Sequence, residues 1–217
     1  MNLNKNIIIR NETPADYRAV EKMTREAFWN LYMPGCVEHY LAHILRSASD
    51  FIPELDLVVE KDNRIIGNVM YTKAKLIDET GREKTILTFG PVCIDPDFQR
   101  QGLSKLLLEK SFTIAKQLNY DAIVIFGMPS NYVSRGFESC LKHHVSLNGT
   151  YPTAMLVKEL VPGVLKEHQW LYQESPAMNV DMAKVDTFDQ TFKPKAKEWQ
   201  PSQEEFEIIS HSTISEN

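Results

Sequence analysis

An amphipathic helix between two apolar strands is the feature that most constrains this chain. The helix has an apolar face made of Leu103, Leu106, Leu107, Ile114, Ala115 and Leu118. Residues 85–94 before it are typical of a strand, and residues 122–126 after it are continuously apolar, as in a strand buried on both faces. A strand–helix–strand crossover places its two strands parallel and close together. Residues 85–126 therefore predict a parallel strand pair inside a layered α/β domain.

The remaining segments predict that most of the sheet is antiparallel. Polar turns separate the strand-like runs 57–59, 65–77 and 85–94, which indicates a three-stranded meander. The other predicted elements are a strand at 7–10, a helix opened and capped by Thr13 and running to Phe28, a helix at 37–47, a short helix ending near Gly136, and strands at 144–147 and 154–160.

Length and composition fit one domain with an appendage. The chain has 217 residues, about 1.4 domains at about 150 residues each. Residues 1–163 are predicted to form the domain, and residues 164–217 an extension packed on it, with a short helix at 182–192. The aromatic residues Trp170, Tyr172 and Phe188 either anchor a docking or dimer interface or cover a sheet face, and we favour the covering role.

Charge and hydropathy exclude several classes of partner. The net charge is −5, whereas a protein that binds duplex nucleic acid needs a basic surface. The longest apolar run, residues 122–128, is too short for the roughly 20 residues that span a bilayer. Cys36, Cys93 and Cys140 are odd in number and widely spaced, which predicts neither disulfides nor a zinc site. We expect a cytoplasmic protein that binds neither nucleic acid nor membrane.

A polar loop with one glycine joins the strand ending near Ile94 to the amphipathic helix. Backbone N–H groups at the helix N-terminus suit an anionic phosphate. Gly102 lets a ligand approach the backbone, and Arg100 and Lys105 add positive charge. Any strand–turn–helix has such a terminus, so Gly102 could equally serve only the turn. The two commonest phosphate-binding motifs are absent from the sequence.

Two motifs resemble those of a known family. The run Gln99-Arg100-Gln101-Gly102-Leu103-Ser104 resembles the Q/R-x-x-G-x-G/A signature of the GNAT superfamily of acyl-CoA N-acyltransferases. Ser104 departs from the usual Gly or Ala, but it is also small. Residues 90–96 resemble the strand that leads into this loop. Residues 127–137 resemble the family's Asn/Tyr helix followed by Gly-Phe, with Tyr132 four residues before Gly136. The resemblance covers roughly residues 7–160.

The resemblance implies a stand-alone, bacterial-type N-acetyltransferase with a C-terminal extension. Its fold would be a GNAT-like mixed, mostly antiparallel sheet with a splayed central parallel strand pair flanked by helices. Acetyl-CoA would be the co-substrate, with its pyrophosphate in the loop and its pantetheine arm on the backbone of residues 92–94, and no metal is expected. The implied cofactor-binding residues are Val92, Cys93, Ile94, Gln99, Arg100, Gln101, Gly102, Leu103, Ser104, Lys105 and Asn131.

The implied reaction is direct attack of an amine on the acetyl thioester. Tyr132 is the predicted proton donor to the departing thiolate, because a phenol is protonated at neutral pH. The alternative is that Tyr132 only packs. Asn131 either contacts the cofactor or caps the short helix. Cys93 and Cys140 are interpreted as small buried residues, since this mechanism needs no nucleophilic thiol.

The acceptor is predicted only as a small-molecule or peptide amine, and the negative charge favours a cationic one. In this family the second helix borders the acceptor site, so Glu38 and His39 are predicted substrate-binding residues. His39 and His43 share the i, i+4 spacing of a metal pair, but the sequence shows no third ligand, and we favour surface histidines. No general base is predicted, and a homodimer is possible.

Two functions remain open from the sequence. The first is an acetyl-CoA:amine N-acetyltransferase, and the second is a non-catalytic module that binds acyl-CoA as a sensor or regulator. Both bind the cofactor. Only the enzyme needs Tyr132 and an acceptor pocket.

Overall fold

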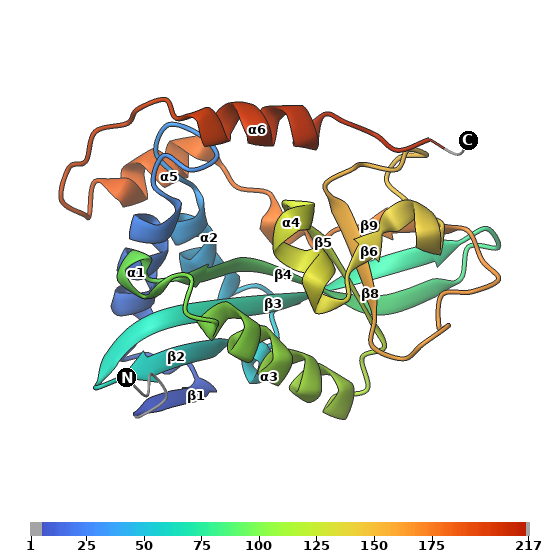
Figure 1. Cartoon of the computed structure of the whole chain (residues 1–217), viewed down its shortest axis with the longest axis horizontal. Helices are drawn as coiled ribbons and strands as arrows, with labels where there is room; N and C mark the ends of the chain where they lie inside the picture. The colour runs from blue at the N-terminus through green and yellow to red at the C-terminus, as the bar shows by residue number, and fades with distance from the viewer. Residues whose placement is uncertain (1–5, 216–217) are drawn as a thin grey trace.

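The computed structural model describes residues 6–215. These residues form a mixed, nine-stranded sheet. Helices lie on both faces of the sheet (Figure 1). The strands are β1 (Ile7–Asn11), β2 (Leu57–Lys61), β3 (Arg64–Asp78), β4 (Glu83–Ile94), β5 (Ala122–Phe126), β6 (Glu138–Ser139), β7 (Val145–Ser146), β8 (Met155–Glu159) and β9 (Trp170–Gln173). The helices are α1 (Tyr17–Phe28), α2 (Glu38–Leu45), α3 (Leu103–Gln117), α4 (Pro129–Tyr132), α5 (Met182–Asp189) and α6 (Pro201–Ser210).

The predicted meander and parallel pair are both present. The strand order is β1-β2-β3-β4-β5-β8-β6, and β9 pairs with β3 and β7. Strands β4 and β5 are parallel but share a single registered pair, Leu87 with Ile123. Beyond Leu87 the two strands separate, while β4 stays paired with β3 up to Ile94. The splayed central pair and the mixed, mostly antiparallel sheet are therefore confirmed.

The two faces of the sheet are covered by different helices. On one face Leu107 and Phe112 of α3 pack in the main core, which includes Tyr71 of β3. On the other face Val20 of α1 packs in a cluster with Val58 of β2. Their full or nearly full burial stabilises each layer by roughly 1.5–3 kcal/mol per large apolar side chain.

Two predicted boundaries are wrong. Helix α1 begins at Tyr17, and Thr13 does not cap it, because the Asp16 carboxylate accepts hydrogen bonds from the Thr13 N–H and hydroxyl at 2.9 and 2.7 Å. Asp16 also binds Arg10 at 2.7 Å, and this holds residues 13–16 in a turn. The predicted strand 144–147 is reduced to Val145–Ser146, because His144 ends a 3-10 turn with a φ of 52°.

The C-terminal segment adds a strand and two helices. Strand β9, which lies after the predicted boundary at 163, pairs with Lys75–Asp78 of β3 in the same sheet. Trp170 and Tyr172 are buried there as members of the sheet, not as a layer over one of its faces, and Phe188 lies on α5 against His43 of α2. The predicted helix near 182–192 is present as α5. Helix α6 was not predicted.

The three cysteines are buried free thiols, as interpreted for Cys93 and Cys140. Within residues 6–215, no helix has both the length and the apolar character that crossing a membrane requires.

Candidate functional site

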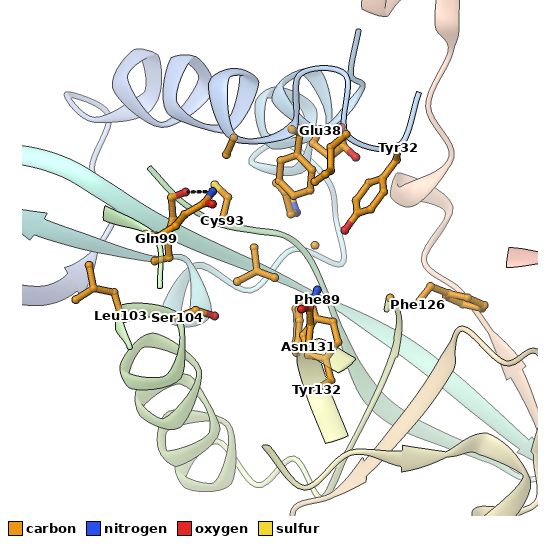
Figure 2. A pocket seen from close by; sticks show the side chains of 18 of the residues that line it. Tyr32, Glu38, Phe89, Cys93, Gln99, Leu103, Ser104, Phe126, Asn131 and Tyr132 are labelled. Atoms are coloured by element: carbon orange, nitrogen blue, oxygen red, sulfur yellow. Dashed lines mark hydrogen bonds between the residues drawn. The ribbon is translucent and has the colours of Figure 1, made fainter. Parts of the chain in front are cut away.

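A cavity of about 570 Å³ lies where β4 and β5 separate. Its walls come from the end of β4, the loop before α3, the helices α1, α2, α4 and α6, and the segment between α1 and α2 (Figure 2). The predicted site residues that line this cavity are Glu38, Val92, Cys93, Ile94, Gln99, Arg100, Gly102, Leu103, Ser104, Asn131 and Tyr132.

One edge of β4 is open inside the cavity. Residues Val92, Cys93 and Ile94 pair with β3 on one side. On the other side β5 has already separated from β4, so alternate backbone N–H and C=O groups have no strand partner there. An extended polar chain can hydrogen-bond such an edge as an added strand does.

The loop before α3 is shaped to face an anion. Gly102 is the N-cap of α3 with a φ of 82°, a left-handed conformation that favours glycine. A Cβ at this position would meet no atom within 4 Å, so there is open space above the backbone. The first N–H groups of a helix lack intrahelical acceptors and lie at the positive end of its dipole. Gln99 anchors the loop, donating from Nε2 to the Ile94 carbonyl at 3.2 Å (Figure 2).

Cations flank this loop. Arg100 and Arg135 line the main cavity. A neighbouring cavity of about 280 Å³ shares Arg135 and is also lined by Lys105 and Lys158. Lys105 therefore lies beside the main cavity and does not line it. Burial lowers the pKa of Lys158. Gln101 is exposed, and its side chain donates to the Asp97 carbonyl at 3.4 Å.

Tyr132 lies in an aromatic cluster at the cavity wall. Its ring centroid is 5.9 Å from that of Phe89 and 5.7 Å from that of Phe137. A Cβ on Gly127 would be 2.6 Å from the tyrosine ring, so only glycine leaves room for it. Burial raises the pKa of Tyr132, and its phenol stays protonated at neutral pH. Asn131 lies inside α4 and lines the cavity, so it does not cap that helix.

Glu38 and Tyr32 lie across the cavity from α3 (Figure 2). Glu38 is the only carboxylate among the described residues that line the cavity. It accepts a hydrogen bond from the Val37 N–H at 3.0 Å, and burial raises its pKa to about 7. Burial and the nearby Glu38 raise the pKa of Tyr32, whose hydroxyl points into the cavity.

His39, the neighbour of Glu38, is not part of the cavity lining. Its ring is fully buried, with Nδ1 3.3 Å from the Cys36 thiol and Nε2 3.2 Å from the Asp189 carboxylate. Burial lowers the pKa of His39 to about 4, so the ring is neutral at pH 7. The interpretation as a surface histidine is wrong for His39. It holds for His43, which is half exposed and 2.9 Å from Glu21.

The described residues contain no group of three or more His, Cys, Asp or Glu side chains placed to hold a metal ion. Cys93 lines the cavity with its thiol 3.5 Å from the Thr24 hydroxyl. Burial raises the pKa of Cys93 to about 12, which keeps the thiol protonated and weakly nucleophilic.

Several residues of the cavity were not predicted from the sequence. Tyr32 lies in the irregular segment between two helices, and Phe206 lies on the unpredicted α6. Their ring centroids are 4.6 Å apart. A contact between residues so far apart in the chain leaves no local pattern in the sequence. Arg135 was visible within the second motif, but nothing in the motif marked it as a cavity residue.

Comparisons with known proteins agree on one family. The model of the acetyltransferase (GNAT) family matches residues 22–138. A GNAT family N-acetyltransferase from Escherichia coli, solved in complex with CoA, is 22% identical, with a TM-score of 0.71 over 83% of this chain and 96% of that one. A GNAT family acetyltransferase from Brucella melitensis, solved with acetyl-CoA, is 20% identical, with a TM-score of 0.63 over 80% of this chain and 98% of that one. These likenesses show a shared fold. No curated protein sequence matches the chain significantly.

Proposed function

The chain belongs to the GNAT family of acetyltransferases, and we propose that it transfers an acetyl group from acetyl-CoA to an amine by direct attack of the amine on the thioester. The observation that carries this proposal is one continuous cavity. It joins an anion-suited loop and an open strand edge to a protonated phenol and a half-buried carboxylate.

The cofactor side of the cavity suits the three parts of coenzyme A. The open edge of β4 at residues 92–94 would bind the amides of the pantetheine arm. The first turn of α3 from Gly102 would hold the pyrophosphate, with Arg100 as a counter-charge. Lys105, Arg135 and Lys158 supply further positive charge beside it. The CoA and acetyl-CoA in the E. coli and Brucella proteins of the same fold support this arrangement.

The chemistry needs three proton transfers. Glu38, with a pKa near 7, accepts a proton from the incoming ammonium, so that a neutral amine nitrogen can attack the carbonyl carbon. A C–N bond forms, the C–S bond breaks, and the nitrogen loses its second proton to solvent, to which Glu38 also returns its proton. Tyr132 donates its proton to the departing thiolate and is reprotonated from solvent. A non-catalytic sensor would need neither group, and membership of an acetyltransferase family favours the enzyme.

We expect acetyl-CoA to stabilise the fold. A ligand that binds only the native state adds about 2.7 kcal/mol at 100 times its dissociation constant. For a chain of this length, that is a rise in melting temperature of roughly 5–10 °C. The measurement is thermal unfolding with millimolar acetyl-CoA or CoA, with ATP as the control nucleotide. An unchanged melting temperature with both CoA compounds contradicts the cofactor assignment.

A further inference from the structure

The acceptor end of the cavity is apolar apart from two groups. Glu38 and Tyr32 supply the polar atoms there. The apolar lining comes from α1, the segment after it, α2 and α6, and consists of Ala27, Phe28, Leu31, Leu41 and Phe206. The cations of the cavity, Arg100 and Arg135, belong to the loop before α3 and the turn after α4. An acceptor at this end therefore meets one carboxylate and mainly hydrocarbon.

Helix α6 forms a fixed wall of this end, because both of its ends are tied to the core. At its start, Ser202 Oγ donates to the Leu31 carbonyl at 2.7 Å and Gln203 Nε2 donates to the Asn30 carbonyl at 3.0 Å. Past its end, Thr153 N donates to the Ser212 carbonyl at 2.9 Å. Figure 1 shows α6 in red, crossing above the helices and the sheet. Phe206 reaches from α6 to the ring of Tyr32.

Glu38 lacks a cationic partner in the structure. Among residues 6–215, its surroundings supply the backbone N–H groups of Val37 and of Glu38 itself and no positive side chain. A half-buried carboxylate in this setting is stabilised by a ligand that brings its own positive charge. A ligand that carries a carboxylate beside its amine would instead face Glu38, and the described residues that line this end include no arginine, lysine or histidine to neutralise it.

We propose that the acceptor is a small primary amine on an apolar, aromatic or alkyl body, which lies against Tyr32 and Phe206 with its ammonium group at Glu38. Helix α6 sets this preference through Phe206. The inference rests on the acetyltransferase function proposed above and names the acceptor class of the same site.

The test is a panel of amines matched in pairs, with thiol release from acetyl-CoA as the readout. Phenethylamine and hexylamine represent the proposed class, ethanolamine and spermidine are polar amines, and phenylalanine adds a carboxylate to the phenethylamine skeleton. Each buried methylene is expected to raise kcat/KM about fourfold. We expect phenethylamine to exceed ethanolamine by at least about tenfold, since an aromatic ring buries 150–250 Å². We expect it to exceed phenylalanine by a similar factor, because the carboxylate of phenylalanine would face Glu38.

Two substitutions on α6 assign the preference to this helix. Phe206→Ala is expected to raise KM for phenethylamine about tenfold or more, because truncating this half-buried aromatic removes contact equal to several methylene groups. Ile208→Ala is the matched control, because Ile208 lies on the same helix, is 60% exposed and does not line the cavity. Equal KM values in the two variants would overturn the role of α6.

The outcomes separate the acceptor class from the function. If the enzyme acetylates ethanolamine or spermidine but neither phenethylamine nor hexylamine, the proposed acceptor class is wrong and the acetyl-transfer function stands. No turnover of any amine overturns the acceptor class. If acetyl-CoA binds in the thermal assay, the cofactor site stands; if it does not, the proposed function falls as well. Preference for phenylalanine over phenethylamine contradicts the charge argument at Glu38.

Glu38→Gln tests the carboxylate directly. The amide keeps the shape and loses the charge, so kcat/KM for phenethylamine is expected to fall about 10- to 100-fold, the worth of a charge-assisted hydrogen bond. In the parent protein, kcat/KM should rise as pH increases through about 7, because the ionised carboxylate is the active form. The neighbours Tyr32, Cys36 and Cys93 all have raised pKa values and stay neutral in this range. A rising limb that survives in Glu38→Gln contradicts the assignment.

Discussion

Replacing Tyr132 with phenylalanine is expected to lower the rate of acetyl transfer by about 10²–10⁴-fold, the usual contribution of general acid catalysis. Phenylalanine keeps the ring and its packing against Phe89, Phe137 and Gly127. Only the hydroxyl is lost. Because burial raises the pKa of this phenol, it carries its proton throughout the neutral range and is able to donate it. Acetyl-CoA binding should change little.

The measurement is the single-turnover rate at saturating amine, alongside the dissociation constant of acetyl-CoA. Tyr32→Phe is the matched control, because Tyr32 lines the same cavity from the acceptor side and also has a raised pKa. We expect Tyr32→Phe to alter KM for the amine and to spare the chemical step. The reverse pattern would make Tyr32 the proton donor. Joint loss of turnover and acetyl-CoA affinity in Tyr132→Phe would mark Tyr132 as a binding residue.

The centre of the fold could be predicted because its signals are local. The apolar face of α3 and the continuous apolar run of β5 each lie within one element, and their order alone requires a parallel pair. The loop from Gln99 to Ser104 and the turn that carries Tyr132 are short motifs in which neighbouring residues act together. These are also the segments that bring most of the predicted residues to the cavity.

Helix α2 shows where sequence patterns fail. Glu38 and His39 are adjacent, so their side chains point about 100° apart on the helix. One lines the cavity and the other is buried beneath α5, where it meets Asp189 and the ring of Phe188 at 5.5 Å. The local sequence around a histidine is the same whether its helix face is exposed or is covered by a distant segment. The position of α5 decides the difference, and nothing near His39 encodes it.

Helix α6 and strand β9 of the C-terminal segment could not be predicted for a related reason. Helix α6 is held by hydrogen bonds from polar side chains such as Ser202 and Gln203 to backbone carbonyls in the distant segment after α1. It therefore needs no continuous apolar stripe, and its sequence shows none. Strand β9 is only four residues long. It is stabilised by pairing with Lys75–Asp78, the part of β3 that extends past its pairing with β2. Both elements depend on a surface that exists only after the core has formed.

Gly102→Glu is expected to abolish acetyl-CoA binding at concentrations that saturate the parent protein. The open space above Gly102, where a Cβ meets no atom within 4 Å, is where the pyrophosphate would lie. A carboxylate there occupies that space and repels the phosphate charge. Like charges that face each other cost several kcal/mol, about 10²–10³-fold in affinity. Gly102→Ala, which adds the Cβ without the charge, should lose less.

Backbone strain must be separated from this effect, because any L-residue at a φ of 82° is strained by roughly 1–2 kcal/mol. Gly81 provides the control. It has a φ of 86°, a Cβ there also meets no atom within 4 Å, and it lies in the β3–β4 turn, which is not part of the cavity. Gly81→Glu therefore carries the same strain and the same added charge. Both variants should unfold at similar, slightly lowered temperatures, and only Gly102→Glu should lose acetyl-CoA in a calorimetric titration. If both lose it equally, the loss comes from strain, and if neither does, the pyrophosphate binds elsewhere.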